Sequence, residues 1–341
     1  MKIGIVGAGA IGGLIAVRLS LAGQPVSVVD RGAHLNAIRK NGLRLVHADG
    51  SEEVATNLRA VATCAEAGEQ DLVFLAVKAN QIAPLAPQLA AMFHRDTAVI
   101  PLQNGLPWWY FQKFSGPHGG YRMRTADPDG VIAAHIDPAR IVGCVVYPAG
   151  EIVAPGVVKH VEGDRFPIGE LDGAETERVK QISEIMTKAG LKAPILADIR
   201  SEIWLKLWGN LSFNPISALT HATLVDVCQD PTTRALAGDM MREAQAIGEK
   251  LGATFRVPLE KRIAGAEKVG KHKTSTLQDV EAGRAIEIDA LIGSVKELGE
   301  LTGVATPHID AVYALMTLLA RTMEAARAKV VLEPVREEAS T

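Results

Sequence analysis

Cysteine is scarce in this sequence of 341 residues, and the three that occur are Cys64, Cys144 and Cys228. Their number is odd, and no two of them form a CxxC motif. A disulfide framework or a zinc site built from thiolates needs more cysteines at closer spacing. We therefore expect no disulfide framework and no metal site, and we expect reduced thiols in a cytoplasmic protein.

A surplus of basic residues is also missing. The 36 lysines and arginines are outnumbered by 39 aspartates and glutamates, which gives a formal net charge of -3 and a pI near 6.3. A surface for nucleic acid or for an anionic membrane needs clustered positive charge, and the chain has no basic run. The sequence therefore predicts a small-molecule substrate, with neither a nucleic acid nor a membrane as partner.

Long hydrophobic runs are absent as well. A run such as residues 72–77 has the length of a β-strand, whereas a membrane helix needs about 20 apolar residues. The N-terminus carries one lysine and then a glycine-broken apolar stretch, which is typical of a strand and turn rather than of a signal peptide. We expect a soluble protein.

The chain is long enough for two domains, because single hydrophobic cores usually stop growing below this length. In its first part, helix-length segments alternate with strand-length apolar runs at residues 2–6, 25–29, 71–77 and 98–102. Continuous apolar strands are typical of parallel sheets that are buried on both faces, and right-handed crossovers connect them. We predict a doubly wound, Rossmann-like α/β domain over residues 1–197. Strands within residues 141–168 are expected to extend its sheet.

From about residue 198 the pattern becomes helical. Apolar residues recur at helical spacing over residues 201–214, 232–252, 258–269, 276–302 and 308–330. We predict an all-α domain over residues 198–332, followed by a flexible tail over residues 333–341. The segment 115–140 is rich in glycine, proline and aspartate, and we expect a long loop there.

A glycine-rich turn carries the first functional signal. The segment GAGAIG, from Gly7 to Gly12, follows the first strand and opens the first helix. In this context the first glycine permits a tight turn, the second lets a pyrophosphate approach the backbone, and the third allows close helix packing. Asp30 follows Gly7 by 23 positions, as the acidic residue of such motifs does. The pattern predicts a dinucleotide-binding turn.

The kind of nicotinamide cofactor is left open by two adjacent residues. Asp30 could accept a hydrogen bond from the ribose 2′-hydroxyl of NAD, whereas Arg31 could pair with the 2′-phosphate of NADP. The structural alternative makes Asp30 a helix N-cap and Arg31 a surface charge. Lys78 and Asn104 each follow a strand run, where ligands bind in parallel sheets, although a solvated lysine and a turn asparagine are the alternatives.

A polar stripe carries the second functional signal. Lys206, Asn210 and Asn214 recur at a spacing of four, so they share one face of a helix that is otherwise crowded by tryptophan and leucine. A partly desolvated ammonium can donate a proton and can stabilise the oxygen that gains charge when a carbonyl is reduced. Lys206 is therefore the predicted general acid, and the asparagines would orient the substrate. The alternative is a surface lysine paired with Glu202.

A second polar group lies in residues 273–289. Ser275 could cap a helix that begins at Thr276, with Gln278 completing a capping box, and substrate contact is compatible with that role. Glu287 lies about 18 Å further along a straight helix, at about 1.5 Å per residue. Unless the helix breaks near Gly283, the two residues would touch different parts of a long bound assembly.

Together these segments resemble the ketopantoate reductase (2-dehydropantoate 2-reductase) family over nearly the whole chain. The motifs occur in the family's order and approximate spacing, and they are GAGAIG, Lys78-Ala79, Gln103-Asn104-Gly105, WLKLxxNxxxNP and SxLQDxxxGRxxEID. The last two motifs are specific, whereas the first is shared by many dehydrogenases. Leu224-Val225 stands where the family commonly has Asn-Gly.

The resemblance implies NADPH-dependent reduction of 2-dehydropantoate to pantoate, on the way to pantothenate and coenzyme A. It implies Lys206 as the proton donor, with substrate contacts from Asn210, Asn214 and Ser275. The residues it implies for the cofactor are Gly7, Ala8, Gly9, Ala10, Ile11, Gly12, Arg31, Lys78, Asn104, Ala149 and Glu287. A reductase of another small 2-oxo acid and a nicotinamide-sensing protein without catalysis are the alternatives, and a homodimer is left open.

Overall fold

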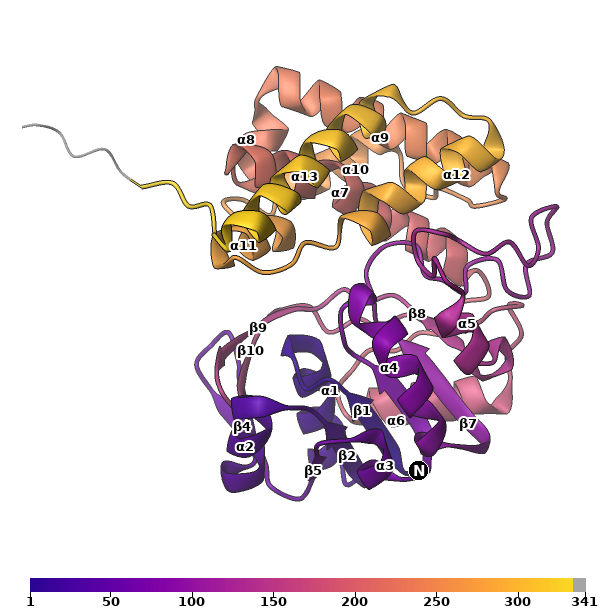
Figure 1. The fold of residues 1–341 in the computed structure, drawn as a ribbon, viewed down its shortest axis with the longest axis vertical. Helices are drawn as coiled ribbons and strands as arrows, with labels where there is room; N and C mark the ends of the chain where they lie inside the picture. The colour runs from indigo at the N-terminus through magenta and orange to yellow at the C-terminus, as the bar shows by residue number, and fades with distance from the viewer. Residues whose placement is uncertain (334–341) are drawn as a thin grey trace, which may run out of the picture. The chain divides into compact units, whose positions relative to one another are not determined.

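The computed structural model describes residues 1–333, which pack into two units (Figure 1). The first unit ends at Ile203 and the second begins at Trp204, so the division falls inside helix α7 (Ile199–Thr220). The first unit contains sheets and helices, and the second, as far as residue 333, contains helices only. The predicted order of an α/β unit and an all-α unit is confirmed. Apart from residue 333, the predicted tail lies outside the described residues.

A five-stranded parallel sheet forms the centre of the first unit. Its strand order is β5-β2-β1-β6-β7. The strands are β1 (Ile3–Val6), β2 (Val26–Val29), β5 (Arg59–Val61), β6 (Gln70–Leu75) and β7 (Phe93–Pro101). Because β1 pairs with β2 on one side and with β6 on the other, the order of strands reverses at β1. Ligands bind beyond the carboxyl ends of the strands at such a point.

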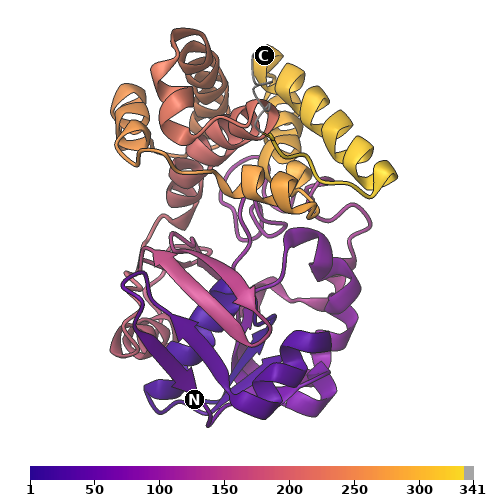
Figure 2. The ribbon, with the colours of Figure 1, turned by 90° about the vertical axis from the view of Figure 1, so that its left-hand side faces the viewer.

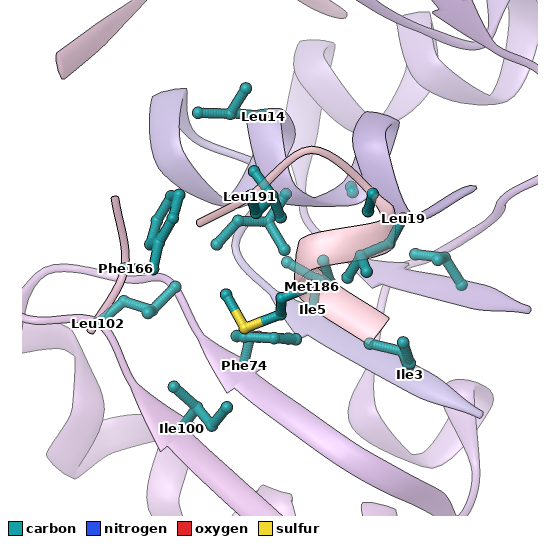
Figure 3. Close-up of a cluster of buried hydrophobic side chains, with 14 of the residues drawn as sticks. Ile3, Ile5, Leu14, Leu19, Phe74, Ile100, Leu102, Phe166, Met186 and Leu191 are labelled. Atoms are coloured by element: carbon teal, nitrogen blue, oxygen red, sulfur yellow. The ribbon is translucent and has the colours of Figure 1, made fainter. Parts of the chain in front are cut away.

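Helices pack against this sheet and complete its core. Figure 3 shows Ile5 and Phe74 of the sheet close to Leu19 and Met186, and all four belong to one buried apolar cluster. β1 is buried at every position, as its continuous apolar run predicts. The helices of this unit include α1 (Ala10–Leu21), α2 (Gly32–Asn41), α3 (Cys64–Ala67), α4 (Ile82–Leu89) and α6 (Glu177–Lys188).

Of the later segments, only Ile141 meets the parallel sheet, through an isolated parallel bridge to Val99 of β7, so the prediction is wrong for the other strands. A four-stranded sheet, ordered β4-β3-β10-β9, contains a hairpin drawn as pink arrows in Figure 2. Its strands are β3 (Leu43–Val46), β4 (Glu52–Ala55), β9 (Ala149–Ala154) and β10 (Val157–Glu162). The remaining strands, β8 (Val142–Cys144) and β11 (Ile168–Glu170), pair with each other. β9 and β10 belong to a separate sheet because β10 pairs in parallel with the distant strand β3 and lies against α1.

The second unit is built from α7 and the helices that follow it. They are α8 (Leu224–Gln229), α9 (Pro231–Lys250), α10 (Leu259–Glu267), α11 (Ser275–Ala282), α12 (Ser294–Thr302) and α13 (Pro307–Ala326). The single helix predicted over residues 276–302 is wrong, because Gly283 takes a left-handed conformation (φ +65°) that ends α11. Helix α7 instead continues through Pro215 as far as Thr220. Within residues 1–333, every helix is too short or too polar to span a membrane.

The tryptophans of the chain serve as core residues. Trp204 and Trp208 are buried in the second unit beside Phe255, and the Trp208 indole N–H donates to the carbonyl oxygen of Met241 at 2.8 Å. In the first unit, the aromatic run of residues 108–111 is buried as well. The Arg200 guanidinium holds this run by donating to the carbonyl oxygen of Tyr110 at 2.8 Å. The buried rings of residues 108–111 therefore stabilise the first unit, and Trp204 and Trp208 stabilise the second.

Two leucines of α1 provide a matched test of the sheet core. Leu19 is 0% exposed and Leu21 is 48% exposed. We expect Leu19→Ala to lower the free energy of unfolding by about 2–5 kcal/mol, because it leaves a cavity beneath the sheet. Leu21→Ala should cost less than about 1 kcal/mol, as surface substitutions do. Urea unfolding followed by circular dichroism measures both, and equal losses would show that the α1 contact does not support the core.

Candidate active site

The three motif glycines of the turn meet different surroundings. Gly7 has φ +95°, which only glycine adopts readily, and a Cβ at Gly12 would overlap the carbonyl oxygen of Gly7. The fold itself therefore requires both. A Cβ at Gly9 would meet no atom within 4 Å, and the backbone there (φ -60°, ψ -168°) is open to other residues. A requirement for glycine at position 9 must come from a molecule that approaches the turn.

Helix α1 begins immediately after Gly9, with Ala10, Ile11 and Gly12 as its first residues. The first backbone N–H groups of a helix have no acceptor within the helix, and they lie at the positive end of its dipole. No acidic side chain occupies the first turn of α1. The turn can therefore offer several amide donors to a phosphate group.

Ala8, between the first two glycines, is held by side chains from the segment after β2. Its N–H donates to Oδ2 of Asp30 at 2.7 Å, and its carbonyl oxygen lies 2.9 Å from Nε2 of His34. Asp30 also accepts from the N–H of Arg31 at 2.7 Å. Asp30 is not the N-cap of α2, which is Arg31 without a side-chain cap, so that part of the structural alternative is wrong, whereas Arg31 is exposed as the alternative expects. Sequence patterns gave no signal for His34.

Two other first-unit candidates follow the strands β6 and β7, which lie on one side of β1 in the sheet. Lys78 lies just beyond β6, and Asn104 follows β7, which pairs with β6. The amide of Gln103 joins the two ends by donating to the carbonyl oxygens of Leu75 and Val77, both at 2.8 Å. The structure thus brings the segments carrying Lys78 and Asn104 together at the carboxyl ends of the parallel strands. The glycine turn follows the carboxyl end of β1 in the same sheet.

Ala149, at the start of β9, also lies near the turn. A Cβ added at its neighbour Gly150 would come within 3.5 Å of the side chain of Ala10. The hairpin formed by β9 and β10 packs against α1. Arg31 is exposed at the start of α2, next to the Asp30 that holds Ala8. The segments that carry Ala149 and Arg31 therefore both lie close to the glycine turn.

The stripe on α7 is continuous in the structure. Lys206 and Asn210 are partly exposed on this helix, and Asn214 is 8% exposed. The amide nitrogen of Asn214 donates to the hydroxyl oxygen of Ser275 at 3.3 Å. This hydrogen bond brings together residues that lie 61 positions apart and come from the two most specific motifs.

Ser275 does not cap its helix as predicted. Thr274 is the N-cap of α11, and its hydroxyl accepts from the N–H of Leu277 at 3.3 Å. Ser275 is the first residue inside the helix and is exposed. Two neighbouring hydroxyl residues can fill the same cap, so sequence alone did not distinguish them. The Ser275 hydroxyl instead meets the amide of Asn214.

Glu202, one helical turn before Lys206, is a buried residue. Its carboxylate is fully buried and accepts from the Tyr147 hydroxyl at 2.9 Å and from the Arg165 guanidinium at 2.6 Å. The surface-pair alternative for Lys206 placed Glu202 at the surface, and that part of it is wrong. The buried pair fixes the first turn of α7, one helical turn before Lys206.

Glu287 lies beyond the break at Gly283, in the short connection before a π-helical turn at Asp289–Gly293. The separation of about 18 Å from Ser275 assumed a straight helix, and that assumption is wrong. The candidates fall into two groups. The second unit holds Lys206, Asn210, Asn214, Ser275 and Glu287, and the first unit holds the rest.

The described residues form no metal centre, and the thiols of Cys64 and Cys228 are not activated. Within residues 1–333, no cluster of three or more His, Cys, Asp or Glu side chains could hold a metal ion. Burial, with a smaller contribution from Glu267, raises the pKa of Cys228 to about 11, and burial also raises the pKa of Cys64. These thiols are therefore protonated near neutral pH and are poor nucleophiles.

Comparison with known sequences connects both units to one family. The family model for "Ketopantoate reductase PanE/ApbA" matches residues 3–108, and that for "Ketopantoate reductase PanE/ApbA C terminal" matches residues 198–320. A 2-dehydropantoate 2-reductase of Mesorhizobium japonicum is 55% identical over 321 residues, which cover 94% of this chain and 98% of that protein.

Comparison with solved structures gives the same result. A Ralstonia solanacearum protein assigned to the ketopantoate reductases superposes with a TM-score of 0.89 at 40% identity, covering 94% of this chain and 98% of that one. A D-mandelate dehydrogenase bound to NADH and anilino(oxo)acetate has a TM-score of 0.80 at 22% identity, covering 95% and 99%. The second likeness shows the fold alone.

Gly9→Ala tests whether the open space at the turn receives a dinucleotide. We expect the added methyl group to weaken NADPH binding about tenfold or more, because it prevents close approach of the pyrophosphate. Stability should be unchanged, because the methyl group meets no protein atom. Fluorescence titration with NADPH and urea unfolding measure the two quantities.

Gly265→Ala is the matched control, because a Cβ there also meets nothing within 4 Å and the residue lies in α10, outside the turn. It should bind NADPH normally. Normal binding by Gly9→Ala would show that no ligand uses this space.

Proposed function

The chain belongs to the ketopantoate reductase family, and we propose on that basis that it catalyses the NADPH-dependent reduction of 2-dehydropantoate to pantoate. The observation that carries the catalytic assignment is the contact between Asn214 and Ser275. It joins the polar stripe of α7 to the start of α11, so that lysine, amide and hydroxyl groups are grouped within the second unit. Such a set can bind a small hydroxylated 2-oxo acid through several hydrogen bonds.

The residues of the first unit fit a nicotinamide dinucleotide. The turn at Gly7, Gly9 and Gly12, with Ala8, Ala10 and Ile11, would take the pyrophosphate, because Gly9 leaves open space at the start of α1. Arg31 would pair with the 2′-phosphate of NADPH. The remaining cofactor contacts that we propose come from Lys78, Asn104, Ala149 and Glu287. When bound, NADPH supplies the hydride for the carbonyl carbon.

Lys206 would act as the general acid. Reduction places negative charge on the carbonyl oxygen, and an ammonium aimed at this oxygen both stabilises the charge and donates the proton. Asn210, Asn214 and Ser275 would hold the carboxylate and hydroxyl groups of the substrate without adding charge. Glu202, held by Tyr147 and Arg165, would keep the start of α7 fixed.

A related 2-oxo acid is the second candidate substrate. Leu224, the first residue of α8, stands where the family commonly has asparagine, which removes one amide from the expected substrate contacts. The D-mandelate dehydrogenase described above binds a bulkier 2-oxo compound, anilino(oxo)acetate. A larger or more apolar substrate would suit the loss of an amide.

The site of action and the assembly are also proposals. The three cysteines are buried and form no disulfide, which suits a cytoplasmic enzyme. A dimeric ketopantoate reductase is known from Staphylococcus aureus, at 19% identity to this chain. We propose a homodimer here too, to be measured by light scattering of the purified chain.

A spectrophotometric assay tests the proposed reaction directly. The loss of NADPH absorbance is followed with ketopantoate, then with NADH in place of NADPH, and then with a panel of 2-oxo acids that includes phenylglyoxylate. We expect efficient turnover of ketopantoate with NADPH. Turnover confined to an aromatic 2-oxo acid would select the second candidate. Tight NADPH binding without turnover of any compound would leave only a sensing role.

Substitutions at Lys206 test the general acid. Lys206→Ala should lower kcat about 100-fold or more, because a positioned general acid contributes at least that much. Lys206→Arg keeps the positive charge but cannot release a proton near neutral pH, so it should remain far below the parent enzyme.

The control is Lys188→Ala, which removes an exposed ion pair with Glu184 and should leave turnover unchanged. For Lys206→Ala, stopped-flow measurement of the hydride-transfer step separates a slower chemical step from slower product release. Near-normal turnover by Lys206→Ala would refute the assignment.

A further inference from the structure

We propose that Asp30 and His34 are positioning residues that jointly hold Ala8 and thereby fix the glycine turn for the pyrophosphate, an inference that rests on the proposed function. Ala8 lies between Gly7 and Gly9, and glycine adopts more backbone conformations than any other residue. A turn with two flexible neighbours needs an external restraint if it is to bind a phosphate without a large entropic cost. The two side chains supply that restraint.

The carboxylate of Asp30 supplies the first half of the restraint. One oxygen accepts from the N–H of Ala8 and the other from the N–H of Arg31, each at 2.7 Å. Asp30 follows β2 and Ala8 follows β1, so the contact links the ends of two paired strands. Hydrogen bonds between a carboxylate and backbone N–H groups are stronger than bonds between neutral groups. Both oxygens are thus engaged by the protein's own backbone.

The imidazole of His34 supplies the second half. Its Nδ1 lies 3.0 Å from the N–H of Gly156, which can only donate, so Nδ1 is the acceptor and carries no proton. The proton of the neutral ring is therefore on Nε2, which donates to the carbonyl oxygen of Ala8 at 2.9 Å. Gly156 lies in the turn between β9 and β10. One ring thereby connects the glycine turn to the hairpin that begins at Ala149.

The two contacts act on opposite polar groups of one residue. Asp30 holds the N–H of Ala8 and His34 holds its carbonyl oxygen, while the Ala8 side chain is fully buried. The peptide units on both sides of Ala8 are therefore fixed. It follows that Asp30 contributes to the affinity for any nicotinamide dinucleotide, NADPH and NADH alike, rather than to the choice between them.

Three variants of His34 separate the two contacts of the ring. Glutamine can place a side-chain N–H near the position of Nε2, whereas asparagine can replace only the acceptor for Gly156, and alanine replaces neither. We expect His34→Ala and His34→Asn to raise the Kd and KM for NADPH about fivefold to tenfold, as the loss of one or two hydrogen bonds does. His34→Gln should stay within about threefold of the parent, and kcat should change less than about twofold in all three.

The measurements are NADPH fluorescence titration, steady-state kinetics and urea unfolding. The titration needs no turnover, so it tests the role of His34 even if the assay with 2-oxo acids fails. Unchanged binding by His34→Ala would overturn the proposal, as would equal weakening by the glutamine and asparagine variants. If His34→Ala does not fold, the glutamine and asparagine pair gives the same answer alone.

Asp30→Ala tests the other half with two cofactors. We expect Kd to rise for NADPH and for NADH by the same factor, within about threefold, because the turn itself is loosened. If Asp30 instead contacts the ribose, the ratio of the two Kd values should change by about tenfold or more. A change of that size would assign Asp30 to cofactor choice and overturn its assignment to the turn.

Discussion

The close approach of α1 to the end of β1 is the constraint on which the first unit depends. Gly12 lies so near the carbonyl oxygen of Gly7 that no side chain fits, and a Cβ there would also lie 2.7 Å from the Cβ of Ala76. This contact sets where α1 crosses the sheet, and so it sets which residues of α1 reach the core. The apolar cluster and the glycine turn thus depend on the same absence of side chains.

Much of the fold was predictable because its signals are local. Continuous apolar strands and the glycine turn identified the parallel sheet, and apolar residues at helical spacing identified the second unit. The pairing of β10 with β3 was not predictable, because periodicity says nothing about which distant strand a segment joins. The periodicity of residues 276–302 likewise continued through Gly283, where a left-handed residue ends the helix.

The residues of the candidate site also differ in whether local spacing or a long-range contact brings them together. Lys206, Asn210 and Asn214 share a helix face, so their spacing was enough to group them. The contact between Asn214 and Ser275 joins distant segments, and family resemblance rather than spacing linked these two residues. His34 had no signal, since its role depends on Gly156, 122 positions away. Local sequence therefore predicted which residues share a helix face better than which distant segments meet.

The burial of all three thiols has a practical consequence. Cys64 and Cys144 lie in the first unit and Cys228 lies in the second, and each is buried. An alkylating reagent can reach a buried thiol only when the surrounding structure opens, so the labelling rate of each cysteine reports the opening of its own unit. The native sequence thus carries internal reporters of local stability in both units, and no probe has to be engineered.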